Sequence, residues 1–360
     1  MNIGVPKEHR PFEFRVGCTP AGAKLLAQQG QTVYVEHDAG KGVGFSDKSY
    51  ADAGANIVYS AREAFGRADL VLKVSRPTYE EISWLMPGAI LAGFLHFTSS
   101  RQDKIDLLLQ NQITTLAYEQ IELADGTLPV LRPLSQIGGR MAAQIGARLL
   151  QNDEGGKGIL LGGIASVPPA EVVIIGAGVV GTNAARAFLD MGAHVTILDT
   201  NLAALQAIFD QRCGAATMIS NPLTIARAVT YADIVVGAVL VKASRAPIVV
   251  TREMVKSMKP RSIIMDISID EGGCVETSRP TTHEHPTFIE EGVIHYCVPN
   301  IPSLVARTAT YAFLNAASPF IMPIVANGLE AALTNNPAIE CGLNTYQGEL
   351  RHLSRLTAKA

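Results

Sequence analysis

The stretch EVVIIGAGVVGTNAARAFLDMGAHVTILD, residues 171–199, decides the fold of the second half of this 360-residue chain. Its apolar start is typical of a buried strand, and the turn GAGVVG, with Gly176, Gly178 and Gly181, follows before a helix pattern begins. Glycines at this spacing permit a tight turn, close approach of a pyrophosphate and close packing of the helix, whose N-terminus offers N–H donors. The stretch predicts a dinucleotide-binding unit.

Asp199 ends the next strand-like run, HVTILD, eighteen residues after Gly181. A carboxylate at this place can accept hydrogen bonds from the ribose hydroxyls of an adenosine. It would also repel a 2′-phosphate, which favours NAD over NADP. The alternative is a glycine-rich turn in an unrelated α/β domain, and the strand, helix and acid in sequence argue against it.

The rest of the chain also alternates between strand patterns and helix patterns. Residues 1–133 carry short apolar runs and helix patterns in the rhythm of βαβ units, and residues 134–301 form a second such series that begins with a long helix, for which Ser135 is a candidate N-cap. The helical tail, residues 302–360, is too short to be a domain. We therefore predict an α/β protein of two Rossmann-like, doubly wound domains, with the first one discontinuous and a cleft between them.

Composition favours small-molecule chemistry. The formal net charge is −3 and neither sign forms a long run, which argues against a nucleic-acid partner. The N-terminus has no apolar signal region and no run of about 18 apolar residues occurs, so we expect a cytoplasmic protein without a membrane partner. Five cysteines without a CxxC pair are expected to be reduced thiols: Cys18, Cys213, Cys274, Cys297 and Cys341.

Two titratable residues follow apolar strand patterns. His96 comes at the end of LAGFLH, where an imidazole would serve as general acid or base, although a histidine there is also commonly structural. Asp270 ends SIIMDISID before a glycine pair, and Asp266 on the same run is its rival. The ends of such strands line the ligand crevice of open α/β sheets.

Two further polar residues lie in loops. Arg15, in EFRVGCTPAG, is suited to bidentate capture of a carboxylate, and the alternative is a solvated loop charge. Asn300, in CVPNIPS, either donates to a nicotinamide or substrate or shapes a turn.

Taken together, the chain resembles the alanine dehydrogenase family, whose architecture is shared with the nucleotide-binding subunit of proton-translocating transhydrogenase. The resemblance runs nearly end to end. It is carried by IGVPKE, EFRV, AYE, GGRMAAQIGA, VVIIGAGVVGTNAA, IDEGGCVETSRPTTHEHPTF and VPNIPSLVARTAT.

The resemblance implies a catalytic domain, residues 1–133 plus 302–360, around an NAD-binding domain, residues 134–301, usually assembled into homo-hexamers. The implied reaction is the reversible oxidative deamination of L-alanine by NAD to pyruvate and ammonia. Arg15 would hold the substrate carboxylate, His96 would bind the carbonyl oxygen and relay a proton, and Asp270 would exchange protons with the amine or attacking water.

The resemblance also implies a set of NAD contacts beyond the first and third glycines of the turn, Gly176 and Gly181. They match the family's cofactor residues at Ser135, Gly178, Val179, Val180, Asp199, Ser220, Val239, Leu240, Ile267, Asp270, Arg279, Val298, Asn300 and Ile301. Some members bind magnesium near the C-terminal helix, but the matching positions are Pro323 and Asn327, so we expect no metal.

One departure concerns the substrate. Where the family reads KVKEP, this chain has KVSRP, so Ser75 replaces a lysine that would help Arg15 bind the substrate carboxylate. Strand alternation places Lys73 and Ser75 on one face, and Arg76 would supply the charge only if the chain bends before the proline. These three residues are therefore candidate substrate contacts. The alternatives are an enzyme for another amino or 2-oxo acid, an imine reductase, or a catalytically weak transhydrogenase-like module.

Overall fold

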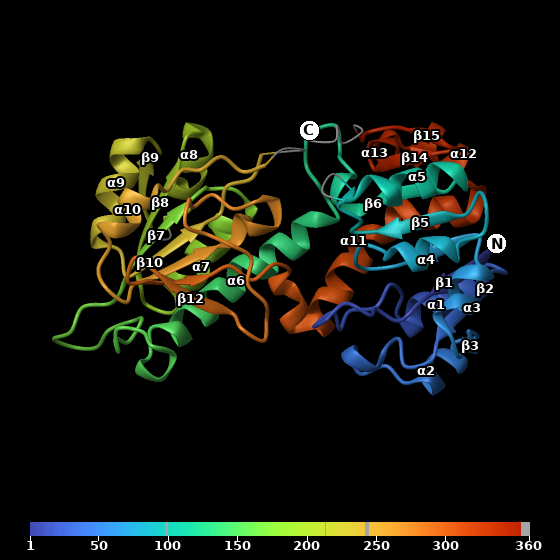
Figure 1. Cartoon of the computed structure of the whole chain (residues 1–360), viewed down its shortest axis with the longest axis horizontal. Helices are drawn as coiled ribbons and strands as arrows, with labels where there is room; N and C mark the ends of the chain where they lie inside the picture. Colours follow the sequence, from blue (N-terminus) through green and yellow to red (C-terminus); the bar gives the residue numbers. More distant parts are fainter. Residues whose placement is uncertain (98–99, 213, 242–244, 354–360) are drawn as a thin grey trace. The chain divides into compact units, whose positions relative to one another are not determined.

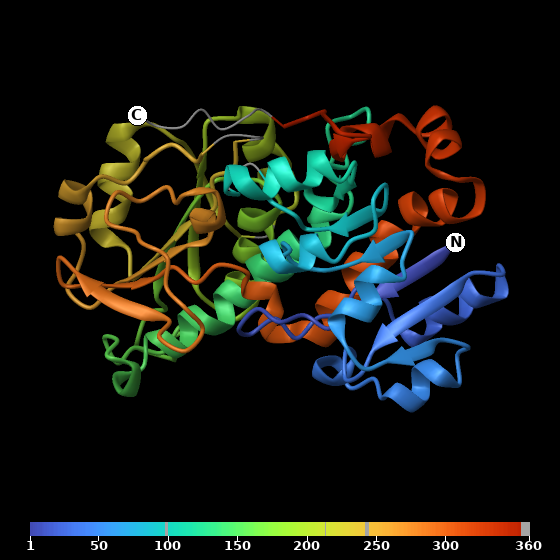
Figure 2. The same cartoon turned by 45° about the vertical axis from the view of Figure 1, so that its right-hand side comes forward.

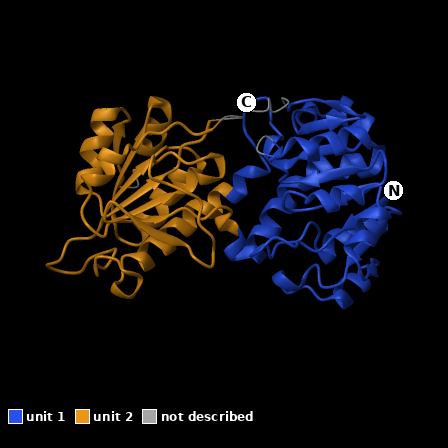
Figure 3. Ribbon diagram, in the orientation of Figure 1, with its two compact units in different colours: residues 1–134, 303–360 blue, residues 135–302 orange. Residues whose placement is uncertain are grey.

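The computed structural model describes residues 1–97, 100–212, 214–241 and 245–353. The chain divides into two compact units, unit 1 with Met1–Leu134 and Ser303–Ala360, and unit 2 with Ser135–Pro302 (Figure 3). Each unit has its own sheet and core. The assignment of catalysis to one and nucleotide binding to the other stays a prediction.

The sheet of unit 1 has the strand order β15-β14-β6-β5-β4-β1-β2-β3 (Figure 1). Strands β1 to β6 are parallel to one another, and β14 and β15 are added antiparallel at one edge. The order reverses between β1 and β4, as in a Rossmann sheet. The strands are β1 Asn2–Val5, β2 Thr32–Glu36, β3 Asn56–Val58, β4 Leu70–Leu72, β5 Ile90–Gly93, β6 Thr114–Ala117, β14 Leu343–Tyr346 and β15 Glu349–Leu350.

The helices of unit 1 are mostly short and begin at side-chain caps. Thr19, Ser46, Ser60 and Thr78 each accept a hydrogen bond from a backbone N–H in the first turn of the helix that follows. The helices are α1 Pro20–Gln28, α2 Asp47–Ala51, α3 Ala61–Gly66, α4 Tyr79–Ser83, α5 Gln102–Gln110, α11 Ala306–Asn327, α12 Leu329–Asn335 and α13 Pro337–Cys341, with 3-10 turns η1 Lys41–Val43 and η3 Tyr118–Gln120.

Helix α11 belongs to the core of unit 1 and can be followed in Figure 1 and Figure 2. With the turn before it, Ile301–Asn327 is long and apolar enough to cross a membrane, a test that core helices also pass. Its Phe313 is fully buried, with ring centroids 5.7 Å from Phe94 and 6.3 Å from Tyr118. These contacts account for the apolar composition of the helix.

Unit 2 repeats the arrangement with the strand order β12-β13-β11-β10-β7-β8-β9. All its strands are parallel except β12, and the reversal lies between β7 and β10. The strands are β7 Glu171–Ile175, β8 His194–Asp199, β9 Ala216–Ile219, β10 Ile234–Gly237, β11 Ile263–Asp266, β12 Thr287–Glu290 and β13 Val293–Tyr296. The predicted fold class, two Rossmann-like sheets, is confirmed.

Both faces of this sheet are buried. In β7, Val172 and Ile174 join one apolar cluster, and Val173 and Ile175 join the other, because successive side chains point to opposite faces. The helices that supply the remaining core residues are α6 Leu131–Leu149, α7 Val179–Asp190, α8 Leu202–Asp210, α9 Pro222–Tyr231 and α10 Arg252–Lys256, and the 3-10 turns are η4 Asn152–Glu154, η5 Ile267–Glu271 and η6 Ile301–Val305.

One local prediction is wrong, and a second is confirmed for the described residues. Ser135 is not an N-cap, because α6 begins at Leu131 and Pro133 is tolerated in its first turn. Of the predicted reduced thiols, Cys18, Cys274, Cys297 and Cys341 are free, and Cys213 lies outside the described residues.

The packing of α11 predicts the effect of Phe313→Ala. Deleting this buried ring should lower the free energy of unfolding by about 3–5 kcal/mol, because it leaves a cavity beside Phe94 and Tyr118. Urea denaturation measures the loss. Leu25→Ala, on the 55% exposed Leu25 of α1, is the control and should change stability by less than about 0.5 kcal/mol. Equal stability of the two variants would contradict the placement of α11 in the core.

Candidate active site

The glycine turn after β7 is shaped by three different requirements. Gly176 has φ +109°, and a Cβ there would lie 2.3 Å from the carbonyl oxygen of Ala238. A Cβ on Gly181 would lie 1.8 Å from the carbonyl oxygen of Gly176. Gly178 differs, because a Cβ there would meet no heavy atom within 4 Å. This open space at the start of α7, where backbone N–H groups lack helical partners, fits a pyrophosphate.

Asp199 lies directly beside this turn. One of its carboxylate oxygens, Oδ2, accepts a hydrogen bond from the backbone N–H of Ala177 at 2.5 Å, and Oδ1 accepts one from Asn201 at 2.7 Å. The side chain is therefore held at the end of β8 next to the glycines. Each carboxylate oxygen has further lone-pair capacity for a ribose hydroxyl.

The structure distinguishes the two rival aspartates. Asp266 is 1% exposed and accepts backbone hydrogen bonds from Ser268, Cys274 and Val275. Burial raises its pKa, although hydrogen bonds from the Ser278 side chain and from the backbone of Val275 and Cys274 oppose the shift. Asp266 thus holds together the loop after β11. Asp270 lies in η5, beyond the end of the strand, and is exposed, with Oδ2 at 3.3 Å from the backbone nitrogen of Asn300.

The other predicted cofactor residues gather along one edge of the unit 2 sheet. Ser220 follows β9, Val239 and Leu240 follow β10, and Ile267 follows β11. The carboxyl ends of parallel strands meet at the same edge, so these residues lie near the turn after β7. The Val239 N–H donates to Ser268 Oγ at 2.9 Å, which connects the loops after β10 and β11.

Residues after β13 complete this edge. Val298 and Ile301 are buried, and Asn300 between them adopts the left-handed conformation, with φ +57°. The guanidinium carbon of Arg279 lies 4.1 Å from the centroid of the Phe288 ring. Its loop is joined to the end of β13, where the Thr281 N–H donates to the Cys297 carbonyl oxygen.

Ser135 reaches the same region from α6. A Cβ on Gly139 would lie 2.3 Å from the carbonyl oxygen of Val180, so α6 packs backbone to backbone against the start of α7. Ser135 lies four residues earlier and shares this face of the helix. Its position in the second turn of α6 therefore agrees with a place near the glycine turn.

In unit 1, Arg15 is not a solvated loop charge. The side chain is 4% exposed, and Nε and Nη2 donate to the two carboxylate oxygens of Glu13 at 2.7 and 2.5 Å. This bidentate pair fixes the plane of the guanidinium. The loop after β1 thus presents an arginine whose geometry is set before any ligand binds.

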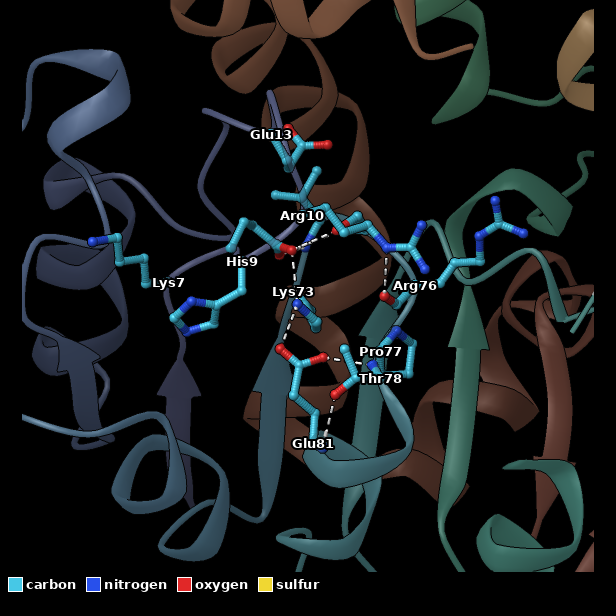
Figure 4. A network of polar contacts seen from close by, with 12 residues as sticks. Lys7, His9, Arg10, Glu13, Lys73, Arg76, Pro77, Thr78 and Glu81 are labelled. Atoms are coloured by element: carbon cyan, nitrogen blue, oxygen red, sulfur yellow. Dashed lines mark hydrogen bonds and ion pairs between the residues drawn. The ribbon is translucent and has the colours of Figure 1, made fainter. Parts of the chain in front are cut away.

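The segment after β4 is built around the buried carboxylate of Glu8, and Figure 4 labels Lys73 and Glu81 of the same network. Strand β4 ends at Leu72, so the predicted alternation does not extend to Ser75. Lys73 is 1% exposed, and its Nζ lies 2.7 Å from Glu8 Oε2 and 3.2 Å from Glu81 Oε1. Burial alone would lower the pKa of Lys73, but the two carboxylates outweigh burial and raise it. Lys73 is a charged residue within a closed ion-pair network.

Glu8 also determines where Ser75 points. Its Oε1 accepts the backbone N–H of Val74 at 2.7 Å, and its Oε2 accepts the Ser75 hydroxyl at 2.5 Å. The next residue, Arg76, is half-buried, and its carbonyl oxygen accepts from Arg10 Nε at 3.2 Å. The sequence analysis did not single out Glu8 or Arg10, although Glu8 ends the IGVPKE motif and Arg10 lies two residues after it.

His96 follows β5 and has φ +44°, an uncommon backbone conformation for a residue other than glycine. Glu119, which follows β6, holds this turn. Its two carboxylate oxygens accept the backbone N–H of His96 at 2.6 Å and of Leu95 at 3.2 Å. The sequence analysis did not single out Glu119 either. Its position after the strand that neighbours β5 was the one sign that it could lie beside His96.

Within the described residues, one cluster has the spacing of metal ligands. Ligand atoms of His37, Asp38 and Asp47 lie within 4.8 Å of one another on unit 1. His37 pairs with both Asp47 and Asp38, and Lys41 binds Asp38, so the contacts are explained without an ion. The absence of a metal stays a prediction.

Comparisons with known proteins agree along nearly the whole chain. Residues 4–138 match the family described as "Alanine dehydrogenase/PNT, N-terminal domain" and residues 142–353 match the corresponding C-terminal domain. An alanine dehydrogenase of Methanococcus maripaludis is 48% identical over 356 residues, 98% of this chain and 95% of that one.

Two solved structures are also similar. An L-alanine dehydrogenase has a TM-score of 0.93 and 42% identity, covering 98% of this chain and 97% of its own. A transhydrogenase from Sinorhizobium meliloti has a TM-score of 0.83 and 26% identity, covering 98% and 99%.

The glycine turn predicts opposite effects for two substitutions. Gly178→Thr should leave the melting temperature unchanged, because φ is −73° and threonine is an accepted N-cap. If the phosphates of a nicotinamide nucleotide lie in this space as predicted, the side chain should weaken nucleotide binding by about 10- to 100-fold, because it fills the space and blocks charge-assisted hydrogen bonds. Gly181→Ala should instead lower the melting temperature. Fluorescence titration and thermal melting measure both effects, and undiminished NADH affinity of Gly178→Thr would place the phosphates elsewhere.

Proposed function

Because the chain belongs to the alanine dehydrogenase/PNT family, we propose that it is an NAD-dependent L-alanine dehydrogenase. The reaction is the reversible oxidative deamination of L-alanine to pyruvate and ammonia. The observation that carries the proposal is the sequence identity with alanine dehydrogenases, 48% and 42% over 98% of this chain. Arg15, His96 and Asp270 are all present. The family further suggests a homo-hexamer.

Members of this family work with a nicotinamide nucleotide, and Asp199 supports NAD as the particular one. A carboxylate beside the glycine turn accepts hydrogen bonds from ribose hydroxyls and repels a 2′-phosphate. A bound nicotinamide nucleotide would supply the acceptor for the hydride of the amino acid's α-carbon. Ser135, Ser220, Arg279 and the residues at the ends of β10, β11 and β13 are the proposed further contacts.

The substrate would be held in unit 1. Arg15 binds the α-carboxylate, and its pairing with Glu13 fixes the orientation of the guanidinium beforehand. In the direction of amination, His96 donates a hydrogen bond and then a proton to the carbonyl oxygen of pyruvate. In the direction of deamination, His96 takes a proton back from the hydroxyl of the carbinolamine. The left-handed turn held by Glu119 determines how the imidazole is presented.

Asp270 supplies the second proton-transfer group, from unit 2. In deamination, water adds to the iminium carbon and ammonia leaves, so one proton is removed from water and one is delivered to the amine. An exposed carboxylate at a loop end can exchange both protons. Asp266 is unsuited to this role, because its carboxylate is buried and hydrogen-bonded to its own loop.

A second candidate is a dehydrogenase of the same family for a different amino or 2-oxo acid. The observation in its favour is Ser75, whose hydroxyl binds Glu8 at the place where the family has a lysine for the substrate carboxylate. Lys73, Ser75 and Arg76 remain proposed substrate contacts for either candidate.

A substrate panel separates the two candidates. The purified protein is assayed by NADH oxidation with ammonia and glyoxylate, pyruvate, 2-oxobutyrate, oxaloacetate or 2-oxoglutarate. We expect kcat/KM to be highest for pyruvate, and NADH to be used in preference to NADPH. Turnover of another 2-oxo acid with none of pyruvate would favour the second candidate, and no turnover of any acid would contradict both.

The role of His96 predicts a separation of catalysis from nucleotide binding. His96→Asn should lower kcat by about 100- to 10,000-fold, because the general acid is lost. Asparagine tolerates the positive φ at this position, so the fold is preserved. NADH affinity, measured by fluorescence, should stay within about twofold. His194→Asn, on an exposed histidine of unit 2, serves as the control, and equal activity of the two variants would exclude His96 from proton transfer.

A further inference from the structure

The chain of unit 2 leaves strand β11 at Asp266 and returns to the same side chain at Cys274. The backbone N–H groups of Cys274 and Val275 donate to Asp266 Oδ2 at 3.0 and 3.1 Å. At the other end of the loop, the Ser268 N–H donates to Asp266 Oδ1 at 3.2 Å. One buried carboxylate therefore closes the loop of residues 267–275 at both of its ends.

The exposed part of this loop carries Asp270. It lies in η5, and the chain then turns back through Gly272 and Gly273, which have φ +97° and +81°. A Cβ on Gly273 would lie 2.9 Å from Asp266 Oδ2, so the turn packs directly on the carboxylate. The direction in which η5 presents Asp270 therefore depends on how the loop is held by Asp266.

The same carboxylate also acts on the loop after β10. Ser268, whose N–H it accepts, receives the Val239 N–H on its Oγ at 2.9 Å. Asp266 is the ladder partner of Gly237 at the end of β10, and a Cβ on Gly237 would lie 3.3 Å from Asp266 Oδ1. Val239 and Asp270 lie on different loops, but both are positioned from this one side chain.

The negative charge of Asp266 is balanced by hydrogen-bond donors. Among the residues that the structure describes, no lysine or arginine pairs with it, and the groups that favour its charged form are N–H and hydroxyl donors of the loop and of Ser278. Each of these donors would be costly to leave unpaired in a buried site, so together they restrict the loop to one arrangement. Asparagine has the same shape but a single acceptor oxygen, and it would not accept hydrogen bonds from both ends of the loop.

Resting on the proposed function, we propose that Asp266 is a positioning residue that places Asp270 for proton transfer and the loop after β10 for the nucleotide. Asp266 is 1% exposed and its two oxygens are occupied by its own loop, so it does not contact a ligand. It acts through Asp270 and Val239. Its loss should therefore affect turnover and nucleotide binding together, whereas a residue that only stabilises the fold affects neither.

Two isosteric variants test this difference. Asp266→Asn should lower kcat with pyruvate by about 10- to 100-fold, because Asp270 is displaced, and should raise the Kd of NADH by about 3- to 10-fold. Asp233→Asn is the matched control. Asp233 is also a buried aspartate of unit 2 and accepts the Glu171 N–H at 3.0 Å, but it lies directly before β10, at the opposite edge of the sheet. Its variant should lower the melting temperature and leave kcat and the Kd of NADH within about twofold.

A double-mutant cycle shows whether Asp266 acts through Asp270. In the Asp270→Asn background, Asp266→Asn should lower the residual kcat by no more than about twofold, because the group that it positions is already lost. If the two losses of kcat multiply instead, Asp266 does not act through Asp270 and the proposal fails.

A pair of glycine variants perturbs the same contact without changing charge. Gly273→Ala pushes the turn away from the Asp266 carboxylate and should lower kcat by about 10-fold. Gly292→Ala is its control, because Gly292 also has a positive φ, +76°, but a Cβ there would meet no heavy atom within 4 Å. Both variants share the backbone strain of an alanine at positive φ, and a loss of kcat in both to the same extent would contradict the proposal.

Hydrogen exchange separates this inference from the proposed function, because it requires no turnover. In Asp266→Asn, peptides that cover residues 267–275 should exchange faster than in the unmodified protein, while peptides of β8 keep their protection. Faster exchange of this loop together with weaker NADH binding supports the positioning role even if no 2-oxo acid is a substrate. Unchanged exchange of the loop, or turnover and NADH affinity that match those of Asp233→Asn, would overturn it even if pyruvate is reduced.

Discussion

The buried carboxylate of Glu8 holds the loops after β1 and β4 of unit 1 together, and the proposed substrate contacts in these loops depend on it. Strands β1 and β4 are neighbours, and the chain continues in opposite directions after them because the strand order reverses there. Glu8 joins the two continuations by accepting hydrogen bonds from Lys73, Val74 and Ser75. A buried carboxylate is stable only when it is paired, so the two loops are held in one arrangement.

The two units share a strand order but use different means at the point of reversal. In unit 2 the turn after β7 is held by close backbone packing at Gly176 and Gly181 and by one carboxylate, Asp199, which accepts the Ala177 N–H. In unit 1 the corresponding loops are held by ion pairs. Bare backbone N–H groups suit a pyrophosphate, whereas fixed charged side chains suit a small acid. The proposed division of roles between the units follows this difference.

The sequence was sufficient for the fold class and for the glycine turn, because both depend on local patterns: strand and helix periodicity, and glycines at fixed spacing. It was insufficient wherever a side chain's partner comes from a distant segment. The contacts of Glu8 with Lys73 and of Glu119 with His96 join residues 65 and 23 positions apart. The start of α6 was misplaced for a local reason, because serine is favoured at N-caps, whereas the helix begins at Leu131 and includes Pro133 in its first turn.

The closed network of Glu8, Lys73 and Glu81 also constrains how such a protein can diverge. Loss of one member leaves the others charged and buried, a cost of about 3–5 kcal/mol, so these positions can change only together. Ser75 and Arg76 lie at the rim of the network and are partly exposed, and a change at either position leaves Glu8, Lys73 and Glu81 paired with one another. If Ser75 and Arg76 contact the substrate as proposed, substrate preference can drift through these two adjacent positions by single residue changes, while the strands beneath them keep their arrangement.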